Sequence, residues 1–171
     1  CWRPDPPPLR DAVAFNQALP VLRRTGALAL AWRRLEPTCQ QEADEAAMRG
    51  AIRSLAAASL EYEHWLPRVL AAFHAAGIEA MVVKGWAVAR HYPRGCRPYG
   101  DLDLCVDPAR YTEARRVAAS LPAAAPEVDL HPAYPKLYDR SWAQLRREAR
   151  HLTLGDATVL VPGEEDHLRL L

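Results

Sequence analysis

The sequence lacks a long apolar run. Its apolar stretches are short and interrupted by Arg or Glu, although half of the 171 residues are hydrophobic. A membrane-spanning helix needs roughly 20 consecutive apolar residues, so we expect no transmembrane segment and no membrane partner. A basic region followed by an apolar stretch, which is typical of a secretory leader, is also missing. These absences predict a cytoplasmic protein.

The sequence also lacks closely spaced cysteine pairs. None of its four cysteines, Cys1, Cys39, Cys96 and Cys105, forms a C-x-x-C motif or a zinc-binding spacing. Disulfide frameworks and structural zinc sites show such patterns. We therefore predict free thiols in a reducing compartment, with Cys105 as a small core residue.

A strong net charge is missing as well. The 22 Lys and Arg residues nearly balance the 21 Asp and Glu residues, for a formal charge of +1. A chain of this kind has no global attraction to nucleic acid or to an anionic membrane. No internal repeat is visible, and the length is enough for one domain with a buried core and a helical extension.

The first part of the chain has helical periodicity. It begins near residue 10, after a proline-rich start, and we expect Pro20 and Pro37 to interrupt it. A segment rich in Ala, Leu, Glu and Arg follows and ends at Gly77, a typical helix stop. The sequence therefore predicts a helical N-terminal region over residues 1–76.

After Gly77 the pattern changes to short strands that alternate with helices, which predicts an α/β core over residues 77–171. The expected strands cover 78–83, 101–106 and 127–132, with a hairpin over 151–161, and the expected helices cover 85–93, 108–121 and 141–150. The closing "EEDHLRLL" is typical of a helix start. Its Leu168 and Leu171 need a partner surface, so we expect the core to be truncated at the C-terminus.

Two aspartates occupy alternate positions of the second expected strand, "GDLDLCVDP" (100–108). Alternate residues of a strand share one face, so Asp101 and Asp103 lie together, opposite the apolar Leu102 and Leu104. Two carboxylates this close repel each other unless a cation lies between them. The alternation therefore predicts a metal site at Asp101 and Asp103.

Further charged residues precede this strand. Lys84 and Gly85 follow the first strand at a helix start, where backbone N–H groups favour an anion. Arg97 stands four residues before Asp101, and its guanidinium could reach whatever the carboxylates hold.

The third strand adds another acidic face, because Glu127, Asp129 and His131 alternate with apolar residues. Glu127 competes with Asp129 for the role of third carboxylate. We interpret His131 as a structural residue that bonds a backbone group near the site. The other histidines show no shared metal-binding spacing.

The order "VVKGWAVARHYPRGCRPYGDLDLCVDP" followed by "VDLH" resembles the uncharacterised nucleotidyltransferase family of the polymerase-β-like superfamily. The resemblance rests on a Lys-Gly turn and an R-P-x-G-D-[IL]-D-L segment and covers roughly residues 45–171. It implies an α+β fold in which a small mixed sheet with flanking helices follows the all-helical segment. The Gly-Ser that is usual in the superfamily is Lys-Gly here, so the phosphate-contacting serine is absent.

The resemblance also implies an activity, the transfer of a nucleoside monophosphate from a nucleoside triphosphate such as ATP to a hydroxyl acceptor. Asp101, Asp103 and Asp129 would be the catalytic residues and would bind Mg²⁺ or Mn²⁺. Lys84, Gly85 and Arg97 would hold the β and γ phosphates. The acceptor could be a protein, a peptide, a small molecule or RNA, and the sequence specifies neither the base nor the oligomeric state.

Two other functions remain open at this point. One is an inactive binding or regulatory module with the same fold, as half of a toxin–antitoxin pair, although an inactive site has no reason to keep repelling carboxylates. The other is a glycosyltransferase that binds a sugar nucleotide through D-x-D. The helical upstream half argues against this last function.

Overall fold

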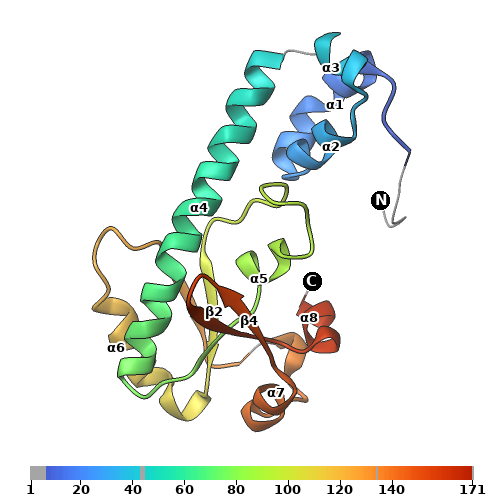
Figure 1. Ribbon diagram of the computed structural model, residues 1–171. Helices are drawn as coiled ribbons and strands as arrows, with labels where there is room; N and C mark the ends of the chain where they lie inside the picture. The colour runs from blue at the N-terminus through green and yellow to red at the C-terminus, as the bar shows by residue number, and fades with distance from the viewer. Residues whose placement is uncertain (1–6, 43–44, 134, 171) are drawn as a thin grey trace. The chain divides into compact units, whose positions relative to one another are not determined.

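The computed structural model describes residues 7–42, 45–133 and 135–170. These residues form two compact units. Figure 1 shows the chain coloured by residue number. The first unit comprises Cys1–Ala58 with Tyr92–Pro98, and the second comprises Ser59–His91 with Tyr99–Leu171. The helix α4 (Glu45–Ala75) contributes residues to both.

The first unit is helical. It contains α1 (Ala12–Arg24), α2 (Leu28–Arg34), α3 (Pro37–Glu42) and the start of α4. The Asp11 side chain caps α1 by accepting a hydrogen bond from the Ala14 N–H at 2.8 Å. Phe15, Leu28, Leu35 and Met48 form a buried hydrophobic cluster in this unit.

The two proline predictions for this region have different outcomes. Pro37 is the first residue of α3, where its missing N–H costs nothing, so the expected interruption is confirmed. The prediction for Pro20 is wrong, because α1 continues through it. Leu19 and Leu22, on either side of Pro20, pack against the buried cluster, and this packing offsets the lost backbone hydrogen bond, which costs about 3 kcal/mol in a helix interior.

The C-terminal end of α4 follows the predicted pattern. Gly77 has φ +68°, a left-handed conformation that glycine adopts without steric cost. The Ile78 N–H donates to the Phe73 carbonyl at 3.0 Å, which is the long hydrogen bond of a Schellman cap. This cap turns the chain from α4 into the first strand.

The second unit contains a five-stranded mixed sheet in the order β3-β2-β1-β5-β4. Its strands are β1 (Ala80–Val82), β2 (Leu102–Val106), β3 (Val128–His131), β4 (Arg150–Leu154) and β5 (Ala157–Val161). β1 is antiparallel to β2 and parallel to β5, while β2 is parallel to β3. The expected fold class, a helical segment followed by a small mixed sheet with flanking helices, is confirmed.

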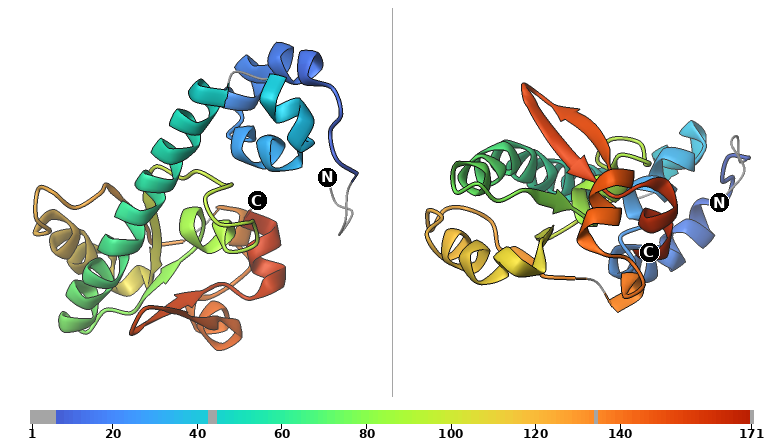
Figure 2. Two further views of the ribbon diagram at one scale, coloured as in Figure 1. Left: turned by 45° about the horizontal axis from the view of Figure 1, so that its top comes forward. Right: turned by 90° about the horizontal axis from the view of Figure 1, so that it is seen from below.

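Helices cover both faces of this sheet (Figure 2). They are the C-terminal part of α4, α5 (Gly85–Ala89), α6 (Tyr111–Ala119), α7 (Trp142–Glu148) and α8 (Glu164–Leu170), with single 3-10 turns at Pro108–Arg110 and Pro135–Leu137. Leu102, Leu104 and Val106 of β2 belong to one core cluster, and Cys105 belongs to a second cluster with Leu145 of α7 and Leu170 of α8. Asp103 therefore lies on the Cys105 face of the sheet, and Asp101 directly precedes the strand.

The cysteines within the described residues, Cys39, Cys96 and Cys105, are free thiols, while Cys1 lies outside those residues. Burial raises the pKa of the Cys105 thiol to about 12. Cys105 is thus an unreactive core residue, as expected. None of the described helices combines the length and the apolar character needed to cross a bilayer.

A buried ion pair anchors α8. The Asp166 residue is 1% exposed, and its carboxylate lies 3.1 Å from Arg140 Nε. On the same helix Leu170 is buried, whereas Leu168 is 73% exposed; Leu171 lies outside the described residues.

We expect Asp166→Ala to lower the free energy of unfolding by about 2 kcal/mol, because it removes the buried partner of Arg140, which keeps the more exposed Glu148 and Glu165. Urea unfolding of the variant checks this. Glu165→Ala is the matched control, since the Glu165 side chain is 78% exposed in its pair with Arg140, and it should cost less than about 1 kcal/mol. Equal losses for both variants would show that burial of the Asp166 pair is unimportant.

Candidate active site

The pairing of β2 with β3 brings the two acidic strand faces together. These strands are parallel and in register, so Asp103 lies beside Asp129 and Cys105 lies beside His131. The Leu102 N–H also donates to the Glu127 carbonyl at 3.0 Å, which places Asp101 next to Glu127 at the start of the two strands. The result is a row of carboxylates at the start of β2 and β3.

Asp103, Asp129 and His131 form the tightest cluster in this row. Each offers one ligand atom, and these atoms lie within 4.8 Å of one another. His131 Nε2 is 3.0 Å from Asp129 Oδ2 and 3.7 Å from Asp103 Oδ1. The Asp103 side chain is only 6% exposed, whereas the Asp129 side chain is 52% exposed. One carboxylate is therefore held in the protein interior and the other is open to solvent.

Lys84 supplies a positive charge to this row. Its Nζ lies 3.2 Å from Asp103 Oδ1, and the Val83 N–H donates to the Asp103 carbonyl at 3.1 Å. The salt bridge and the backbone hydrogen bond hold Val83 and Lys84, which follow β1, against Asp103 near the start of β2. The Lys84 ammonium group therefore neutralises the buried Asp103 carboxylate.

Gly85 allows the chain to turn close to β2. Its φ of +41° lies in the left-handed region, and a Cβ at this position would stand 3.4 Å from the Asp101 carbonyl oxygen and 3.5 Å from Tyr99 Cβ. These distances are ordinary van der Waals contacts, so it is the positive φ that would strain a residue with a side chain at this turn. The helix α5 that begins here has only five residues, so its dipole is small.

Electrostatics at Asp101 favour a bound cation. Burial raises the pKa of the Asp101 carboxyl, and the Asp103 and Asp129 carboxylates raise it further, while Lys84 acts in the opposite direction. The carboxylates together carry more negative charge than Lys84 removes. An additional positive charge would stabilise the ionised form of Asp101.

We expect Asp101→Asn to raise the melting temperature of the metal-free protein at neutral pH. A carboxyl group whose pKa is higher in the folded protein than in the unfolded chain lowers the stability of the fold at any pH at which the group is ionised. This loss of stability disappears as the pH falls below the pKa of the unfolded chain, which is about 4. Thermal unfolding at neutral pH and at acidic pH in EDTA checks this. A lower melting temperature for the variant at neutral pH would contradict the repulsion inferred here.

The sequence-predicted residues are not all brought together. Asp101, Asp103, Asp129, Lys84 and Gly85 all lie where β1, β2 and β3 meet, and the competing Glu127 lies beside them. Arg97 belongs to the other compact unit, where its guanidinium lies 5.6 Å from the centroid of the Tyr92 ring. Its role towards phosphates stays a prediction.

The contact between His131 and the carboxylates was not foreseen. The sequence interpretation gave this side chain a backbone partner, but its ring lies against Asp129 and Asp103. The sequence does indicate that the two side chains are neighbours, because side chains two residues apart in a strand, such as those of Asp129 and His131, share one face.

This arrangement has the chemistry of a divalent-cation site. Carboxylate oxygens are the ligands that Mg²⁺ and Mn²⁺ prefer, whereas imidazole suits softer ions such as Zn²⁺. Asp103 and Asp129 face each other across two strands, and Asp101 continues the row. The residues present therefore fit a hard divalent metal ion.

Comparison with known proteins matched the chain to a protein family. A family model described as uncharacterised nucleotidyltransferase matches residues 11–125, about two thirds of the chain. The match includes residues 11–44, which precede the region of resemblance noted in the sequence, and it ends before Asp129. Neither the curated proteins nor the solved structures gave a match.

Proposed function

The chain belongs to the uncharacterised nucleotidyltransferase family, and we propose that it transfers a nucleoside monophosphate from a nucleoside triphosphate to a hydroxyl acceptor in a reaction that needs Mg²⁺ or Mn²⁺. The observation that supports this most is the row of carboxylates on β2 and β3 with Lys84 against it. This row combines a place for a cation with a neighbouring cationic side chain suited to a phosphate.

In this proposal Asp101, Asp103 and Asp129 hold the metal. A divalent cation bound there would neutralise the triphosphate and the leaving pyrophosphate and would lower the pKa of the acceptor hydroxyl. The difference in exposure between Asp103 and Asp129 supports a division of roles. We assign the buried Asp103 to the nucleotide-bound cation and the open Asp129 to the side of the acceptor.

Lys84 has two partners in this proposal. Without a nucleotide its ammonium neutralises Asp103 at 3.2 Å. If a bound cation took over that neutralisation, the Lys84 ammonium would be released to the β and γ phosphates. Gly85 keeps this corner free of a side chain, so that phosphates can approach the backbone.

The proposed reaction is an in-line substitution at the α-phosphorus. The acceptor oxygen forms a bond to this phosphorus, and the bond from the phosphorus to the bridging oxygen of the β-phosphate breaks. Pyrophosphate leaves with that oxygen, and in this proposal the Asp129 carboxylate takes the proton of the acceptor hydroxyl. His131, 3.0 Å from Asp129 Oδ2, holds this carboxylate in position.

Equilibrium binding tests the nucleotide part of the proposal. We expect the purified chain to bind a nucleoside triphosphate in Mg²⁺ or Mn²⁺ and to lose this binding in EDTA. A sugar nucleotide is the comparison ligand, because a preference for it would favour a glycosyltransferase instead. Binding that is equally tight with and without metal would contradict the proposal.

A further inference from the structure

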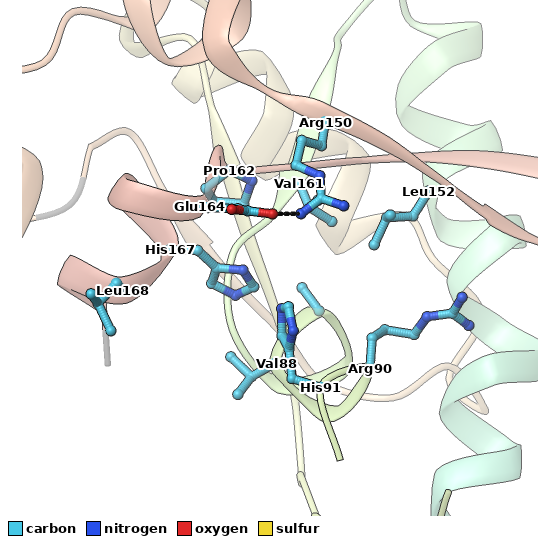
Figure 3. A pocket seen from close by; sticks show the side chains of 11 residues that line it. Val88, Arg90, His91, Arg150, Leu152, Val161, Pro162, Glu164, His167 and Leu168 are labelled. Atoms are coloured by element: carbon cyan, nitrogen blue, oxygen red, sulfur yellow. Dashed lines mark hydrogen bonds and ion pairs between the residues drawn. The ribbon is translucent and has the colours of Figure 1, made fainter. Parts of the chain in front are cut away.

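A cavity lies within the unit that contains the sheet, and the residues that line it do not include those of the carboxylate row. It has a volume of about 680 Å³ and is bordered by α5, the start of β4, the end of β5 and α8. Figure 3 shows its apolar walls, among them Val88, Leu152 and Val161. The cavity is large enough for a small organic molecule.

One buried nitrogen in this cavity has no partner. His167 is 8% exposed, and its Nε2 has no hydrogen-bond partner among the described residues. Its ring faces the cavity and meets the His91 ring edge to face, with centroids 5.7 Å apart (Figure 3). An unsatisfied buried polar group costs about 1–3 kcal/mol, and nothing in the packing of α8 requires one at this place.

The charged groups around the cavity are mostly cationic. Arg90 and Arg150 border it, with Glu164 as the single carboxylate. Arg150 Nη1 lies 2.6 Å from Glu164 Oε1, and the Glu164 side chain is 81% exposed. A guanidinium has five N–H donors, so Arg150 can bind a second oxyanion without releasing Glu164.

His167 is suited to respond to such an anion. Burial lowers the pKa of its imidazole, and His91 and Arg150 lower it further, so the ring is neutral at neutral pH. The charged and titratable groups that line the cavity are Arg90 and His91 at α5, Arg150 on β4 and Glu164 on α8 itself, while β5 contributes apolar side chains. A bound anion would favour the imidazolium form and would draw a proton onto the ring.

We propose that this cavity is a second ligand site, which takes a small molecule with an apolar body and one oxyanion group, either a carboxylate or a phosphate monoester. His167 and Arg150 bind the oxyanion, and Val88, Leu152 and Val161 contact the apolar body. The site does not use the carboxylates of β2 and β3, so ligand binding there is tested independently of nucleotidyl transfer.

Calorimetric titration of the full chain with benzoate, phenyl phosphate and benzyl alcohol tests this site. We expect one or both anions to bind at a single site with uptake of a proton, which is measured by repeating the titration in buffers of different ionisation enthalpy. Benzyl alcohol should bind at least about tenfold more weakly, because it lacks the hydrogen bonds to charged groups. Which of the two anions binds more tightly distinguishes a carboxylate from a phosphate ligand.

Variants show where the anion binds. His167→Phe keeps a ring but removes the nitrogens, and Arg150→Ala acts at a half-exposed position; each should weaken binding at least about tenfold. His151→Ala, at an exposed position outside the cavity, should change nothing, and Asp103→Asn should also retain binding. The proposal is overturned if neither anion binds in the millimolar range, if benzyl alcohol binds as tightly as both, or if neither His167→Phe nor Arg150→Ala weakens binding.

Discussion

Asp103→Asn is expected to abolish metal-dependent triphosphate binding and to lower the rate of nucleotidyl transfer at least about 1,000-fold, which corresponds to about 4 kcal/mol of transition-state stabilisation. Asp103 is the most buried of the three carboxylates and contacts both Lys84 and the His131 ring. An amide keeps the size of the side chain but cannot supply the negative charge that holds a cation. Titration with a triphosphate in Mg²⁺ and a rate measurement check both effects.

Asp107→Asn is the matched control for this variant. Asp107 follows the same strand, and its side chain caps the next 3-10 turn by accepting a hydrogen bond from the Ala109 N–H at 2.9 Å. Asparagine can keep such a cap, so activity should stay within about twofold of the wild type, a change worth less than 0.5 kcal/mol. A fully active Asp103→Asn variant would exclude the assigned metal site.

Asp129→Asn is expected to retain binding of the metal–triphosphate complex but to lower the transfer rate at least about 100-fold. The Asp129 side chain is half exposed and lies on the open side of the cluster, where an acceptor can approach. Its loss should therefore appear in kcat rather than in nucleotide affinity. Single-turnover rates measured beside equilibrium binding separate the two effects.

Glu127→Gln distinguishes the two candidates for the third carboxylate. Glu127 precedes β3 beside Asp101, whereas Asp129 pairs directly with Asp103. We expect only a small change of rate for Glu127→Gln. If this variant lost transfer while Asp129→Asn kept it, the assignment of the third carboxylate would pass to Glu127.

The sequence predicts the local features of the site well. A strand has a period of two, so the shared face of Asp101 and Asp103 follows from their spacing alone. The strands, the helices of the core and the helix stop at Gly77 are likewise encoded by short segments. Such features depend on neighbours in the sequence, and for this reason they could be read without a structure.

Contacts between distant segments could not be read in this way. The spacing does not show that β2 and β3 pair in parallel with Asp103 beside Asp129, because a shift of one residue would move these side chains to opposite faces. It likewise gives no sign that Lys84 pairs with Asp103 before any phosphate is bound.

Tertiary packing explains the other differences. Pro20 was expected to interrupt a helix, but the residues around it pack in a core that sequence periodicity does not reveal. His91 and His167 are 76 residues apart and share no motif, yet α5 and α8 place their rings against each other. A cavity assembled from such distant positions has no signature in a single sequence.

Transfer of label from a triphosphate to an acceptor tests the central claim most directly. The full chain is incubated with a cell lysate and with nucleoside triphosphates that are labelled at either the α- or the γ-phosphate, in Mg²⁺ and in EDTA. Relative to the lysate alone, the added chain should transfer α-label to an acceptor only in Mg²⁺ and should transfer no γ-label to an acceptor, and Asp103→Asn should add neither. Added transfer of the γ-label to an acceptor, or added transfer of α-label that continues in EDTA, would contradict the proposal.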